Sequence, residues 1–99
     1  MMKTNPLMQT AAIVCREVAV DRAPILYAER TAPEDPADSG WQFLCGASEE
    51  DWQSAQVWAV HEVLTYEPSL QPFIEQPYGT IVTRPSKDAS WVVTMRSDS

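Results

Sequence analysis

The period of the hydrophobic pattern changes from two to about 3.6 near the middle of this chain, and this change constrains the fold more than any other feature. Residues 40–45 alternate, with Trp41, Phe43 and Cys45 on one side, as in a half-buried β-strand. Apolar residues within 57–64 recur at three- and four-residue spacing, as on the buried face of a helix. A strand followed by an amphipathic helix in so short a chain predicts an α+β fold.

The remaining segments extend this expectation to an antiparallel or mixed sheet of about five strands with one or two helices packed on one face. We expect strands at residues 11–20, 24–29, 40–45, 80–83 and 90–95, and helices at 55–66 and 70–77. The first two strands are expected to be neighbours, and the last to turn Trp91, Val93 and Met95 inward. Pro68 ends the longer helix because proline cannot continue it.

Chain length predicts one domain over residues 1–99, with residues 1–10 and 97–99 as flexible termini. Pro6 and its polar neighbours interrupt the N-terminal apolar run before a signal peptide can form. No apolar stretch has the roughly 18 residues of a membrane span. We therefore expect a cytoplasmic protein with no membrane contact.

Acidic residues are concentrated in the central part of the chain. The stretch from Thr31 to Thr83 sums to −9 and contains no Lys or Arg, while the flanks sum to +2, which gives the overall −7. Its nine carboxylates belong to Glu34, Asp35, Asp38, Glu49, Glu50, Asp51, Glu62, Glu67 and Glu75. Such a potential attracts basic partners and repels nucleic-acid phosphates, so we expect a basic protein partner and no nucleic acid.

Catalytic and metal-binding patterns are weak. His61 is the single histidine, and its place near the apolar stripe favours a half-buried packing role over a Cys45–His61 dyad. Cys15 and Cys45 lack the paired spacing of a zinc site, and we expect buried thiols in a reducing compartment, with one disulfide in a periplasmic protein as the alternative. The three glycines are too scattered for a phosphate loop. We expect no enzyme, no metal and no cofactor.

Two blocks point to a known family. Residues 38–46 read DSGWQFLCG, and residues 66–80 read YEPSLQPFIEQPYGT. Together, over about residues 11–84, they resemble immunity protein family thirty-three, small bacterial proteins encoded beside polymorphic toxins. The matching positions are Asp38, Ser39, Gly40, Trp41, Phe43, Gly46, Tyr66, Pro68, Pro72, Pro77, Gly79 and Arg84. The chain departs from the pattern at Cys45 and His61, where serine and asparagine are usual.

The resemblance implies a cytoplasmic immunity protein that binds and neutralises a cognate toxin. Combined with the acidic stretch, it predicts that carboxylates speed encounter while a tryptophan such as Trp52 anchors the contact. The expected partner-binding residues are Glu34, Asp35, Asp38, Trp41, Glu49, Glu50, Asp51 and Trp52. A regulatory or adaptor domain with no toxin partner is the alternative function. The protein is expected to be a monomer, or a homodimer that pairs through strand 90–95.

Overall fold

The computed structural model describes residues 6–46 and 55–95, which form strands and short helices joined by turns and loops. The strands are β1 (Ala11–Val14), β2 (Tyr27–Arg30), β3 (Asp38–Leu44), β4 (Gln56–Ala59), β5 (Thr80–Thr83) and β6 (Val92–Met95). The helices are α1 (Arg16–Ala19), α2 (Val60–Tyr66) and the 3-10 helices η1 (Pro6–Gln9) and η2 (Pro68–Phe73). Helix η1 falls in the stretch expected to be a flexible terminus, yet its Leu7 and Met8 pack against the core.

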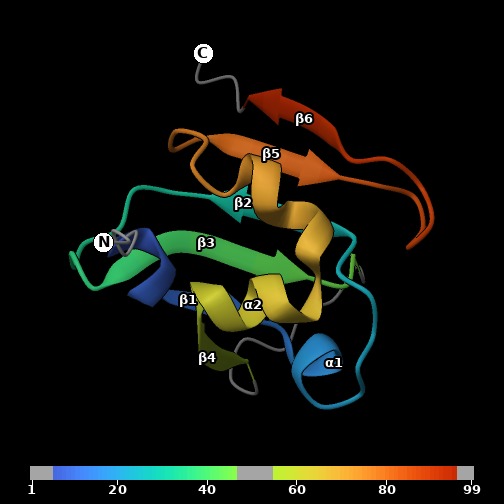
Figure 1. The fold of residues 1–99 in the computed structure, drawn as a ribbon, viewed down its shortest axis with the longest axis horizontal. Helices are drawn as coiled ribbons and strands as arrows, with labels where there is room; N and C mark the ends of the chain where they lie inside the picture. The colour runs from blue at the N-terminus through green and yellow to red at the C-terminus, as the bar shows by residue number, and fades with distance from the viewer. Residues whose placement is uncertain (1–5, 47–54, 96–99) are drawn as a thin grey trace, which may run out of the picture.

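The six strands form one mixed sheet in the order β4-β1-β3-β2-β5-β6 (Figure 1). Strands β1 and β3 are parallel, and the other pairs are antiparallel. The predicted α+β class with a mixed sheet is confirmed, with six strands instead of about five. The expected pairing of the first two strands is wrong, because β3 lies between β1 and β2.

Two segments adopt the other kind of secondary structure from the one expected. Residues 16–19 form α1 instead of continuing the first strand, because a helical turn places Val18 fully in the core. Residues 56–59 form β4 instead of the start of a helix, because they complete the hydrogen bonds of β1, with Val57 opposite Ile13. Tertiary pairing outweighs local propensity in both segments.

The core lies between the sheet and the helices. Figure 1 shows α2 and η2 on one face of the sheet. Val60, Val63 and Leu64 of α2 are buried there against Phe43 of β3 and the other core residues. The carboxylate of Glu62 accepts a hydrogen bond from Ala59 N–H at 2.9 Å, which caps the start of α2. The part of the predicted stripe from Val60 to Leu64 is therefore the helix face that meets the sheet, whereas Val57 lies in β4.

The last strand lies at an edge and is exposed on both sides. All four residues of β6 are exposed, including Val93 and Met95, so the expected inward orientation of these two side chains is wrong. Trp91, just before β6, does pack against the core. None of the helices in residues 6–46 and 55–95 has the length and apolar character needed to cross a bilayer.

Candidate protein-binding surface

Three of the predicted partner-binding residues lie where the chain turns from β2 to β3: Glu34 and Asp35 in the connecting loop, and Asp38 at the first position of β3. The loop closes where Thr31 N–H donates a hydrogen bond of 2.9 Å to the carbonyl oxygen of Gly40. Gly40 has φ +85°, and a Cβ added there would overlap that threonine's own carbonyl oxygen. Only glycine allows the two backbone segments to approach this closely.

Hydrogen bonds hold two of the loop carboxylates in place. Asp35 Oδ1 accepts from Ala37 N–H, and Asp38 Oδ1 accepts from Gly40 N–H, each at 2.8 Å. Asp35 also accepts Asp38 N–H through its carbonyl oxygen at 2.9 Å. Glu34 and Asp35 are exposed, and Asp38 is half-buried. A loop ordered by its own hydrogen bonds loses little conformational entropy when a partner binds.

The loop borders the sheet face opposite the helices. One row of residues crosses all six strands on this face: Val57, Ile13, Gln42, Glu29, Ile81 and Thr94, in strand order. Val57 is 71% exposed, and no residue of the row is Lys or Arg. In the part of the chain that the structure describes, the helices pack on the other face of this sheet (Figure 1).

Two shallow hollows lie where the loop meets this sheet face, and residues of both line them. One, of about 310 Å³, is lined by Asp35, Asp38, Ile13 and Val57, among others. The other, of about 160 Å³, is lined by Glu34, Asp38, Ile13 and Gln42, among others. We call the surface around both hollows the acidic corner, made of Ile13, Glu34, Asp35, Asp38, Gln42 and Val57. It places carboxylates beside the exposed Val57 and the half-buried Ile13, with no basic group among these six.

The other predicted partner-binding residues do not all lie at this corner. Trp41 is 1% exposed, stacks on Phe43 with ring centroids 5.6 Å apart, and donates its indole N–H to the carbonyl oxygen of Ile74 at 2.9 Å. These contacts give Trp41 a place in the core. Glu49, Glu50, Asp51 and Trp52 lie outside the described residues.

The remaining acids of the central stretch lie in or next to the helical segment and line neither hollow of the acidic corner. Glu62 belongs to α2, Glu67 follows it, and Glu75 follows η2. Glu67 accepts a hydrogen bond of 2.9 Å from Arg84 Nη2, whose side chain is 3% exposed. Arg84 Nε also donates to the carbonyl oxygen of Ile25 at 3.0 Å. This ion pair ties the end of α2 to the sheet, so Glu67 serves the fold.

A larger hollow, of about 760 Å³, lies beside α2 and differs in charge from the acidic corner. It is lined by Arg22, Trp58, His61, Glu62, Thr65 and Tyr66. The guanidinium of Arg22 lies 6.0 Å from the ring centroid of Trp58 and 5.5 Å from that of Tyr66. Because Arg22 and Glu62 have opposite charges, the electrostatic potential in this hollow is not uniformly negative.

Two titratable residues of this larger hollow bear on catalysis. His61 is exposed, which corrects the expected half-buried packing role, because the helix begins only at Val60 and turns His61 to solvent. The Tyr66 hydroxyl donates to the carbonyl oxygen of Ala23 at 2.7 Å. Burial raises the pKa of Tyr66, and the nearby Arg22 charge opposes that rise. The hydroxyl therefore stays a protonated donor that holds the fold.

Sequence reasoning missed the apolar half of the acidic corner. Val57 is expected in a helix stripe, whereas it lies on the exposed face of β4. Ile13 belongs to an expected strand, but only the pairing of β1 with β4 brings it next to Val57. Residues 56–59 read QVWA and do not alternate, so the β-branched Val57 and the aromatic Trp58 are the only local sequence signal that favours a strand here.

The comparison with known families identifies the chain. A family model described as the Immunity protein Imm33 domain matches residues 12–94, which include both blocks and extend past the expected region of about 11–84. Among curated proteins and among solved structures, no significant match was found. Because the match spans most of the 99 residues, the chain belongs to the Imm33 family of immunity proteins.

Proposed function

We propose that this immunity protein binds a cognate protein toxin through the acidic corner and thereby neutralises it. One observation carries the proposal: three carboxylates, two of them held by hydrogen bonds, lie beside Ile13 and the exposed Val57 on a sheet face that the described helices leave open. The partner surface that fits is basic with an apolar centre. We further propose that neutralisation takes place in the cytoplasm of the producing cell. It depends on binding and not on catalysis.

The two kinds of side chain have different roles in this contact. Glu34, Asp35 and Asp38 attract a basic surface at long range and raise the association rate. Ile13 and Val57 lose water on contact and slow dissociation. A stable interface buries about 800 Å² on each partner, which exceeds the corner itself, so the toxin would extend over the neighbouring sheet face.

The acidic run between β3 and β4 belongs to the same proposal. Glu49, Glu50 and Asp51 come shortly before β4 in the sequence, and Val57 of β4 lines the acidic corner. We propose that these three carboxylates add to the attraction of a basic partner and that Trp52 anchors the contact. Replacing the three with serine is expected to slow toxin association without changing the free energy of unfolding.

The charge mechanism can be tested with two variants of equal net charge. The first replaces Glu34 with Gln and both Asp35 and Asp38 with Asn, which keeps the oxygen acceptors of the loop. The second, as control, carries Glu62→Gln, Glu75→Gln and Asp88→Asn, three acids outside the acidic corner. Association with the protein encoded by the neighbouring gene is measured by stopped flow or surface plasmon resonance over a range of salt concentrations.

The expected result distinguishes an effect of where the carboxylates lie from an effect of net charge. The first variant should associate about tenfold more slowly at low salt, with a weaker salt dependence, while the control stays close to the wild type. Equal slowing in both variants would mean that only net charge matters, and it would refute the acidic corner as the docking surface. The adaptor alternative is favoured if the neighbouring gene encodes no toxin module.

A further inference from the structure

The parallel pairing of β1 and β3 brings the two cysteines of the chain together. Cys15 directly follows β1 and Cys45 directly follows β3. Parallel strands end at the same edge of a sheet, and Cys15 N–H donates to the carbonyl oxygen of Phe43 at 3.1 Å, which fixes the two strand ends side by side. The thirty-residue separation in sequence hides this proximity.

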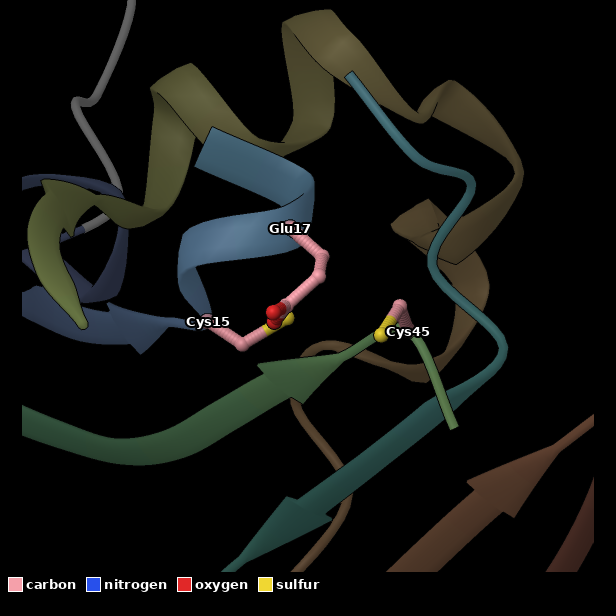
Figure 2. Close-up of side chains that lie close together, drawn as sticks. All are labelled: Cys15, Glu17 and Cys45. Atoms are coloured by element: carbon pink, nitrogen blue, oxygen red, sulfur yellow. The ribbon is translucent and has the colours of Figure 1, made fainter. Parts of the chain in front are cut away.

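Glu17 of α1 completes a group of three possible metal ligands. Figure 2 shows its carboxylate and the Cys15 sulfur side by side, with the Cys45 sulfur pointing toward them. The sulfur atoms of Cys15 and Cys45 and one carboxylate oxygen of Glu17 all lie within 4.8 Å of one another. The two sulfurs are not joined as a disulfide. The three side chains thus converge on one point from three elements.

One oxygen atom of this group is buried without a polar partner. Glu17 Oε1 is buried and has no hydrogen-bond partner among the residues that the structure describes. Buried polar atoms in folded proteins nearly always have a partner. Cys15 is 1% exposed and Cys45 is half-buried, so the carboxylate oxygen faces sulfur and not water. A cation bound between these side chains would give that oxygen its missing partner.

We propose that Cys15, Cys45 and Glu17 bind a zinc ion. Two thiolates and one carboxylate match the ligands that zinc takes, whereas calcium and magnesium prefer oxygen alone. Each thiol releases its proton to solvent on binding. Tetrahedral zinc at about 2.3 Å from each sulfur places the two sulfurs about 3.8 Å apart, which small side-chain rotations reach from the separation seen here. Water takes the fourth position, through the half-exposed side of Cys45.

The zinc would connect the start of α1 to the end of β3, two parts of the fold that are distant in sequence. Since metal binds this arrangement and not the unfolded chain, occupancy raises the stability of the folded protein. The inference is independent of toxin binding, because the acidic corner shares no residue with this site.

The test uses the full chain, kept reduced with a phosphine and stripped of metal with a chelator. It is titrated with Zn²⁺ by calorimetry and with Co²⁺ by absorption, which reports thiolate ligands through a near-ultraviolet charge-transfer band. The variants are Cys45→Ser, at a half-buried position that should still fold, and Glu17→Gln, which keeps the size of the side chain. Glu62→Gln, at an exposed acid of α2, is the control.

We expect one zinc per chain, a higher Tm with zinc, and a thiolate band with cobalt. Glu17→Gln should weaken zinc binding by about tenfold or more. Cys45→Ser, which keeps one thiolate, should bind zinc more weakly and reduce the thiolate band, while the control behaves as the wild type. The proposal is overturned if the reduced wild type binds no zinc or if Cys45→Ser binds it equally well.

Discussion

Gly40→Ala is the substitution whose effect follows most directly from the structure. Gly40 has φ +85°, a left-handed conformation that costs a residue with a Cβ about 1–2 kcal/mol. The added methyl group would also overlap the carbonyl oxygen of Thr31. To relieve this overlap the loop must open, and two hydrogen bonds then weaken: Thr31 N–H to Gly40 O, and Gly40 N–H to Asp38 Oδ1.

The magnitude is the sum of these two effects. Losing two hydrogen bonds costs about 2 kcal/mol, so the total is about 3–4 kcal/mol. Gly79→Ala provides the matched control, because Gly79 also has a positive φ, +96°, but its added Cβ would meet only Met95 Cε at 3.8 Å, an ordinary contact. The control should cost only the conformational part, about 1–2 kcal/mol.

The assay is urea unfolding followed by tryptophan fluorescence, since Trp41 is buried in the same strand as Gly40. Linear extrapolation gives the free energy of unfolding of the wild type and both variants. Gly40→Ala should be less stable than Gly79→Ala by about 2 kcal/mol. Equal losses in the two variants would refute the close approach of the loop on which the acidic corner depends.

Three further predictions test the fold and the surface. Arg84→Met should lower the free energy of unfolding, measured with urea, by roughly 3 kcal/mol, because it leaves the Glu67 carboxylate without its buried cation. Glu67→Gln keeps a hydrogen-bond acceptor and should therefore cost less. A larger loss for Glu67→Gln than for Arg84→Met would contradict the role of the pair. Val57→Lys should change stability by less than about 0.5 kcal/mol because Val57 is 71% exposed, yet it should weaken the proposed binding to the product of the neighbouring gene. Unchanged affinity in calorimetry would remove Val57 from the interface. Tyr66→Phe should cost about 1 kcal/mol at neutral pH through the lost bond to Ala23. Burial raises the folded-state pKa of Tyr66 above its unfolded value, so the advantage of tyrosine is complete below that unfolded value and is lost as pH rises through the folded-state pKa; an advantage that grows with alkaline pH in urea titrations would contradict this sign.

Local patterns in the sequence predicted the parts of the fold that depend on local forces. The alternation around Trp41 and Phe43 gave β3, and the stripe formed by Val60, Val63 and Leu64 gave α2. Segments whose structure depends on a distant partner were predicted less well. Val57 fits a helix stripe and a strand equally in the sequence, and its pairing with Ile13 on β1 decides between them.

The same distinction applies to the candidate site. Glu34, Asp35 and Asp38 are close in the sequence, so a single loop was enough to place them together. Ile13 and Val57 join them only through the strand order, which no local pattern reveals. The proximity of Cys15 and Cys45 depends in the same way on the parallel pairing of β1 with β3.

A growth assay tests the proposed protection of the producing cell, in which this Imm33 protein binds and neutralises a toxin. The product of the neighbouring gene is expressed in a sensitive bacterium alone, with the wild-type chain, and with the variant that neutralises Glu34, Asp35 and Asp38. We predict survival with the wild type and weaker protection by the folded variant. Death of cells that contain the folded wild-type protein together with that toxin would contradict the account.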